Sequence, residues 1–207
     1  MTGQDAPAAR RREKMRGRIM TAANDLFAVK GYADTSMDDI SRSANVALRT
    51  IYLHFSSKAG IFLAFLDAWV DEFVDRIIER PIDEPIADSV AAALAGLREA
   101  GWPDDRIIAE TSAAHPIVSS MGGGSSDIAG HVLQTWVLAQ DRLVDSFQSR
   151  GTYPTSLEPR LRATAVFTAW LTSILVFRDA YTGRGTSPLS SHEIGEAAIR
   201  ALGEGIR

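Results

Sequence analysis

The side chains best suited to binding chemistry lie between residues 36 and 58, and their types are those that contact nucleic acid. Arg49 and Thr50 can reach base edges in a major groove. Hydroxyl, imidazole and ammonium groups that can hold phosphate oxygens accompany them, on Ser36, Tyr52, His54 and Lys58. To act together, these side chains need a short rigid element that presents them on one side.

A first short helix is predicted to begin at Met37. Ser36 can cap free backbone N–H groups, and Asp39 stands three residues later, where a capping box places an acid. Apolar residues then recur at three- and four-residue spacing on one face, at Met37, Ile40 and Ala44. Asn45 follows, and asparagine tolerates the left-handed backbone that reverses a chain within one or two residues.

A second helix is predicted to start near Ala47 and Leu48, directly after that turn. One apolar stripe runs along it, at Leu48, Ile51 and Phe55, while the remaining side chains point elsewhere. This pattern fits a helix-turn-helix that reads DNA. It also fits a helical hairpin with a solvated polar face, which is the commoner case for two short amphipathic helices taken alone.

The segment upstream favours the DNA-reading interpretation. An apolar helical stripe (Ile19, Ala22, Ala23, Leu26, Phe27) ends at Lys30-Gly31, a cationic last turn followed by a capping glycine. Residues 1–58 hold ten Lys or Arg against six Asp or Glu, whereas residues 59–207 hold twelve against twenty, so one end of the chain is basic and the remainder acidic. A localised phosphate contact suits this division better than nucleic acid coating the whole surface.

These residues carry a resemblance to a known family. The pattern Arg18-x-x-x-x-Ala23-x-x-Leu26-Phe27-x-x-x-Gly31-Tyr32-x-x-Thr35-Ser36-Met37-x-x-Ile40, followed by Val46-x-x-x-Thr50-Ile51-Tyr52-x-His54-Phe55-x-x-Lys58, is similar to the tetracycline-repressor (TetR) family. The resemblance covers roughly the first quarter to third of the chain. Four positions depart from the usual residues, Ser41, Asn45, Ala47 and Arg49, and Ala59-Gly60 replaces the acids common after the lysine.

The resemblance implies an all-helical homodimer that binds a palindromic operator and releases it when a small molecule enters the larger domain. It also implies roles for single residues. Phosphate contacts are expected from Thr35, Ser36, Tyr52 and Lys58, and groove contacts from Arg49 and Thr50. The first turn of the second helix, at Ala47 and Leu48, belongs to the expected contact surface, as does His54.

Residues 1–9 are expected to form a disordered arm, since they are polar and contain Pro and Ala. A basic run follows at Arg10, Arg11 and Arg12. This run either enters a minor groove, where narrow A·T tracts attract arginine, or forms a frayed helix start that adds nonspecific affinity. No apolar segment follows it, which argues against a secretory signal.

The expected organisation is a helix-turn-helix domain over residues 10–57, a connecting helix over 58–80 and a helical ligand-binding and dimerisation domain over 81–207. Helix patterning continues at about 86–100, 106–120, 127–149, 156–182 and 189–204, and no strand alternation competes. The uncharged segment 163–177 has fifteen residues, which is short of the ~20 that span a bilayer, so we interpret it as a buried helix. We expect no membrane partner, and we expect the protein to be cytoplasmic.

That uncharged helix is apolar nearly all round, so one side is expected to face a second copy of the chain. The predicted dimer residues lie on it and on the last helix: Phe167, Trp170, Ile174, Ile194, Ala198, Ala201 and Leu202. A small, largely apolar or aromatic effector is expected in the same domain. Its candidate contacts are Trp102, His115, Met121, His131, Trp136, Gln140, Trp170 and Phe177.

Enzymatic chemistry is disfavoured. The chain has no cysteine, which excludes disulfides, cysteine zinc sites and thiol nucleophiles, and it has neither an H-E-x-x-H helix nor a G-x-S-x-G turn. We expect no cofactor and no metal. The sequence therefore predicts a ligand-responsive repressor; a dimeric DNA-binding regulator that takes a protein partner or no ligand is the alternative, and a helical enzyme a remote one.

Overall fold

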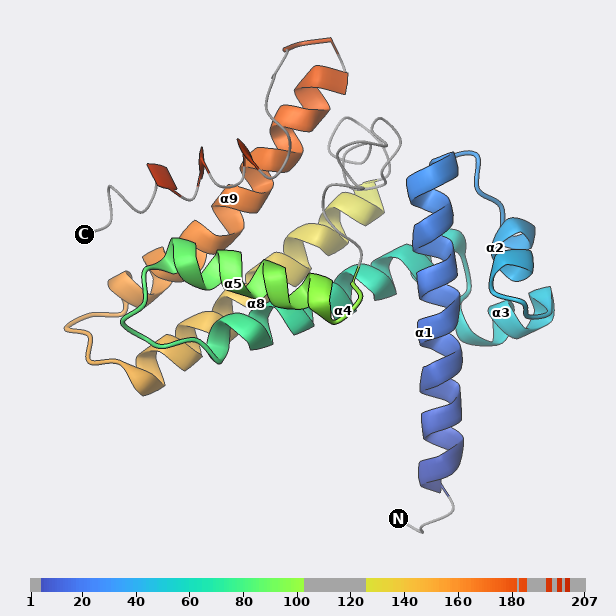
Figure 1. The fold of residues 1–207 in the computed structure, drawn as a ribbon, viewed down its shortest axis with the longest axis horizontal. Coiled ribbons are helices and arrows are strands. Elements are labelled where there is room, and N and C mark those ends of the chain that lie inside the picture. The colour runs from blue at the N-terminus through green and yellow to red at the C-terminus, as the bar shows by residue number, and fades with distance from the viewer. Residues whose placement is uncertain are drawn as a thin grey trace.

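The computed structural model describes residues 5–102, 126–181 and 183–185, together with helical residues at 193–194, 197–198 and 200–201. Every regular element within these ranges is an α-helix, as predicted. Three helices form a small head: α1 (Asp5–Lys30), α2 (Met37–Ser43) and α3 (Leu48–His54). Figure 1 shows this head at one end of the molecule, with α1 standing beside α2 and α3.

The larger body contains α4 (Lys58–Ile78), α5 (Ile86–Glu99), α8 (Ser126–Arg150) and α9 (Leu157–Tyr181). Helix α4 joins the two parts, because it packs on α1 at its start and on α5 and α8 farther along (Figure 1). Its buried stripe runs the whole length from Ile61 to Ile77, so the core of the head continues into the core of the body.

The helices expected at 86–100, 127–149 and 156–182 are confirmed within one residue at each end. The helix expected at 106–120 lies outside the described residues, and the one expected at 189–204 is described only in part. No described helix is long and apolar enough to cross a membrane.

The start of α1 corrects one expectation. Residues 5–9 were expected to be disordered with the rest of the arm, but α1 begins at Asp5 and continues without a break to Lys30. Alanine, arginine, glutamate and lysine dominate residues 8–14, and these are strong helix formers. Adding a turn to an existing helix needs no new nucleus, so the fold of the head extends α1 outward.

Polar contacts fasten α4 to α8. The Asp67 carboxylate accepts hydrogen bonds from the Thr135 hydroxyl (2.8 Å) and lies 2.9 Å from the His131 Nε2 atom. One turn and two turns farther along α4, Asp71 and Asp75 both pair with the Arg142 guanidinium. These acids repeat every four residues, so they lie on one side of α4, and that side faces α8.

Helix α9 corrects the expected dimer face. Phe167 and Ile174 are buried in the protomer's own core, at 2% and 5% exposure, and Trp170 stacks on Trp69 of α4. In the last helical residues Ile194 is buried, Ala198 half-buried and Ala201 exposed, while Leu202 lies outside the described residues. A helix that is apolar nearly all round can be covered by its own domain, and here α4, α5 and α8 provide that cover.

Candidate nucleic-acid interface

The start of α2 is held by the predicted capping box. The Ser36 hydroxyl accepts from the Asp39 backbone N–H at 3.1 Å, and the Asp39 carboxylate accepts from the Ser36 N–H at 3.0 Å. Lys30 also donates to Asp39, and this contact, more than any other, holds the pKa of Asp39 well below its usual range. The Ser36 hydroxyl thus serves the helix start, and it also lies on the exposed side of the head.

The turn between α2 and α3 uses the expected left-handed residue. Asn45 has a φ of 50°, and the Arg18 guanidinium donates to its carbonyl at 2.9 Å. Ser41, which replaces the usual alanine, donates its hydroxyl to the Val46 carbonyl at 2.7 Å and so closes the turn. Ala47 stands at the N-cap of α3 without a side-chain hydrogen bond, as its side chain requires.

Helix α3 presents one side to the core and the other to solvent. Ile51 is fully buried and Phe55 is 5% exposed. Arg49 and Tyr52 are exposed on the outer side, and Thr50 is half-exposed. Leu53 is 68% exposed on the same helix, outside the apolar stripe, as the sequence pattern predicts. An exposed leucine beside polar readers can contact a thymine methyl group.

His54 lies at the end of α3 against α1, half-buried, rather than on the outer side. Its carbonyl accepts from Arg16, whose guanidinium sits 4.4 Å from the centre of the Phe55 ring. Desolvation lowers the pKa of His54, and the charges of Arg12 and Arg16 lower it further, so the ring is neutral near pH 7. A neutral imidazole donates one hydrogen bond and carries no charge toward a phosphate.

Lys58 and Thr35 are used inside the head. The Lys58 amine donates to the carbonyls of Tyr32, Ala33 and Thr35, and it lies 4.3 Å from the centre of the Tyr32 ring. Thr35 is 2% exposed, and its hydroxyl donates to the Gly31 carbonyl at 2.7 Å. Both residues shape the loop between α1 and α2, so the structure gives them a supporting place behind the exposed side of α3.

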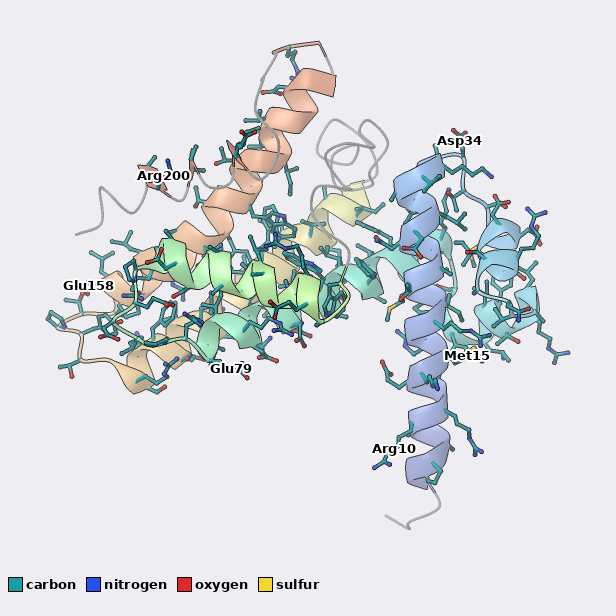
Figure 2. All side chains as sticks on the ribbon, viewed as in Figure 1. Arg10, Met15, Asp34, Glu79, Glu158 and Arg200 are labelled. Carbon is teal, nitrogen blue, oxygen red and sulfur yellow. The ribbon has the colours of Figure 1, made fainter. Side chains whose placement is uncertain are left out.

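The three predicted arginines lie on the first turns of α1. Arg10, Arg11 and Arg12 are exposed. Figure 2 shows Arg10 on the part of α1 that projects beyond α2 and α3, whereas Met15 lies closer to α3 and packs against the core. These arginines therefore belong to a helix and not to an extended arm.

Aromatic side chains meet inside the body, where an effector was expected. Trp170 lies between Trp69 (centroids 5.2 Å) and Trp136 (centroids 5.0 Å). Trp136 is 3% exposed, and its Nε1 atom has no hydrogen-bond partner among the described residues. The structure thus brings two of the predicted effector residues together from α8 and α9.

The other predicted effector residues are less closely grouped. Gln140 accepts from the Thr164 hydroxyl at 3.2 Å, His131 binds Asp67 on the α4 side of α8, and Trp102 contacts Phe65 at a centroid distance of 5.6 Å. His115, Met121 and the Phe177 side chain lie outside the described residues. Within the described ranges no cluster of three or more His, Cys, Asp or Glu could hold a metal ion.

Comparison with known proteins places the head in a family. A family model described as bacterial regulatory proteins, tetR family, matches residues 19–65. The transcriptional activator FasR of Mycolicibacterium smegmatis is 40% identical over 55 residues, which are 27% of this chain and 25% of FasR. IcaR of Staphylococcus aureus, a negative regulator of the biofilm operon icaADBC, is 42% identical over 48 residues, 23% of this chain and 26% of IcaR. The matched segment spans about a quarter of the length of each relative.

Solved structures extend the likeness of fold to nearly the whole chain. The fatty acid degradation regulator FadR from Bacillus halodurans superposes with a TM-score of 0.58 at 17% identity, over 93% of this chain and 96% of that one. FadR from Thermus thermophilus, a TetR-family repressor solved in complex with lauroyl-CoA, gives a TM-score of 0.51 at 20% identity, over 93% and 95%. The head thus matches the tetR family of bacterial regulatory proteins in sequence, and nearly the whole chain shares the fold of these solved structures.

Proposed function

We propose that this protein is a transcriptional repressor that binds a palindromic operator as a homodimer and is released by a small lipophilic effector. The observation that carries the proposal is the exposed side of α3, where Arg49 and Tyr52 stand free on a helix whose other side is buried by Ile51 and Phe55. A helix fixed in this way can enter a major groove as a rigid body. Arg49 and Thr50 read base edges, and Tyr52 holds a phosphate.

Dimerisation needs a face that one protomer leaves uncovered, and α8 and α9 supply it. Four of their exposed apolar residues, which we call the outer apolar face, are Leu133, Val137, Leu157 and Leu161, with exposures from 41% to 59%. Each helix contributes a pair at four-residue spacing, and the two helices pack side by side. Two such faces across a twofold axis bury both stripes in a four-helix arrangement. Twofold symmetry then sets two recognition helices roughly 34 Å apart, one turn of DNA.

The tryptophan cluster in the body supports an apolar effector. Trp69 comes from α4, which leads to the head, whereas Trp136 and Trp170 come from α8 and α9. A ligand that separates these rings changes how α4 lies on α8 and therefore how the two heads are spaced. The lauroyl-CoA bound by the similar fold from Thermus thermophilus supports a lipophilic ligand for this body. A preference of ~1 to 3 kcal/mol for the released arrangement suffices to change DNA affinity by one or two orders of magnitude.

The decisive experiment selects binding sites for the purified protein from a random DNA pool and measures affinity by fluorescence anisotropy. Arg49→Ala should change which sequences are selected, because a base reader is lost. Tyr52→Phe should weaken binding to all sequences by a similar factor, because a phosphate contact is lost. If Arg49→Ala keeps the wild-type sequence preference, α3 is not the reading helix.

A second experiment tests the dimer and the effector. Val137→Asp should shift the protein to a monomer in sedimentation analysis, whereas Val29→Asp should not. Val29 is the matched control because it is 86% exposed on the head, away from the outer apolar face. A library of fatty acids, their CoA esters and aromatic compounds is then titrated into the protein–DNA complex. Occupancy that no compound changes would contradict the effector and favour regulation by a protein partner.

A further inference from the structure

The positive charge of the head resides almost entirely in the first half of α1. Residues 5–18 contain six Lys or Arg and two Asp or Glu, whereas residues 19–58 contain four of each. The family match begins at residue 19, so the segment that holds the excess charge precedes it. Residues 19–58 by themselves carry equal numbers of positive and negative side chains. DNA affinity, however, rests largely on cations that neutralise phosphates.

Contacts inside the head occupy most of the remaining cations. Lys30 and Arg42 both bind the Asp39 carboxylate. The Lys58 amine donates to three backbone carbonyls. Of the four cations in residues 19–58, Arg49 alone is exposed without a recorded partner among the described residues. One arginine per head leaves little electrostatic attraction for a DNA backbone.

Two lines of basic residues lead along α1 to the two ends of α3. Arg11, Lys14 and Arg18 lie at three- and four-residue spacing, and Arg18 binds the Asn45 carbonyl in the turn before α3. Arg12 and Arg16 lie four residues apart, and Arg16 binds the His54 carbonyl at the end of α3 at 2.9 Å. The inner arginine of each line thus anchors α1 to the reading helix, while Arg11, Arg12 and Lys14 remain exposed.

The helical state of this segment decides how it can meet DNA. An α-helix with side chains is ~10–12 Å across, whereas the minor groove of B-DNA is ~6 Å wide. A helix therefore cannot enter that groove as an extended arginine arm does. Residues 5–18 are roughly 21 Å long as a helix, which is comparable to about six base-pair steps along the duplex.

From these observations we infer that residues 5–18 form a rigid basic arm that binds the phosphates flanking each operator half-site through Arg11, Arg12 and Lys14. The inference rests on the proposed function, since it needs α3 to place the head on DNA. The arm adds affinity without reading sequence, and it makes binding depend strongly on salt. It also lengthens the DNA needed for full affinity by about six base pairs on each side.

The test compares the full-length protein with the variant R11Q/K14Q/R12Q on a DNA site selected by the wild type, from 50 to 400 mM NaCl. Glutamine keeps the helix because its helix propensity is close to that of arginine and lysine. A dimer of the variant lacks up to six phosphate contacts, so the slope of log affinity against log salt should fall by roughly 3 to 5. Affinity at 100 mM NaCl should fall by at least about 100-fold. The matched control R98Q/R184Q/R200Q removes the same charge from exposed positions on the body and should change the slope by less than about 1.

A second comparison uses two duplexes, one ending at the half-sites and one extended by six base pairs on each side. The wild type should bind the extended duplex more tightly, with G·C and A·T flanks alike, and the arm variant should bind both duplexes equally. A preference for A·T flanks, or displacement of the arm by the minor-groove ligand netropsin, would overturn the inference, because the arm would then unwind into the groove. If the wild type selects a site but the arm variant has the same salt slope as the wild type, the inference alone is overturned. Failure of the wild type to select any site would overturn the proposed function and the inference with it.

Discussion

Lys58 provides the sharpest test of how the head is built, because its sequence position and its structural position indicate different roles. The family pattern marks it as a phosphate contact. In the structure, however, its amine donates to the carbonyls of Tyr32 and Ala33 and, at 2.8 Å, to that of Thr35. An ammonium group has three N–H donors, and all three are used. We therefore predict that Lys58→Met damages the fold of the head and leaves the number of phosphate contacts unchanged.

The expected loss follows from these contacts. A hydrogen bond from a charged donor stabilises a fold by about 1.5–3 kcal/mol, and the cation over the Tyr32 ring adds about 0.5–1 kcal/mol. The contacts share one amine and are not additive, and burial lowers the pKa of Lys58, which shows that part of the gain is offset by desolvation. A net loss of about 2–3 kcal/mol remains, which for a chain of this length lowers Tm by roughly 4–12 °C.

The assay is urea unfolding of the full-length protein, followed by DNA binding at several salt concentrations below the unfolding temperature. Lys30→Met is the matched control, since the Lys30 side chain is 44% exposed where it forms its salt bridge with Asp39, and its loss should cost less than about 1 kcal/mol. The salt slope of Lys58→Met should equal that of the wild type. Unchanged stability together with a slope lower by about 2 per dimer would refute the structural role and restore the phosphate contact.

Three further predictions concern other parts of the molecule. Gly31→Ala should lower the free energy of unfolding in urea by about 1–2 kcal/mol, because Gly31 has a left-handed φ of 86°. Gly17→Ala should instead stabilise α1 by up to about 1 kcal/mol, since a Cβ at that position meets no atom within 4 Å. Trp136→Phe should stay within about 1 kcal/mol of wild-type stability, because loss of ring volume is offset by removal of the unpaired N–H. The same variant should weaken release of DNA by an effector about tenfold. A loss of stability above about 3 kcal/mol would show that the ring serves packing alone. Hydrogen bonding from Arg80 lowers the pKa of Glu84 from its usual 4.5 to about 2. The stability that this carboxylate contributes is therefore complete above about pH 4.5 and is lost as the pH falls toward 2. Glu84→Gln should lower the urea midpoint at pH 7 and have no effect near pH 2, and an equal effect at both pH values would contradict the assignment.

The arm and the dimer face show where patterning of the sequence misled. The Pro- and Ala-containing start suggested disorder, yet residues 5–9 continue α1 because an established helix propagates outward at little cost. Phe167 and Ile174 were expected to face a partner, and they are buried in their own protomer. Periodicity shows that a helix side is apolar, but it does not show which neighbour covers that side.

What the sequence alone determined is the local architecture of the head. The capping box of Ser36 with Asp39 and the left-handed turn at Asn45 depend on atoms within a few residues of one another, so residue type and spacing suffice to predict them. Only the tertiary structure decided that Lys58 serves a loop more than twenty residues away and that His54 rests beside α1. Such contacts depend on how helices pack, and a side chain that can hold a phosphate can equally hold a carbonyl that the fold brings within reach.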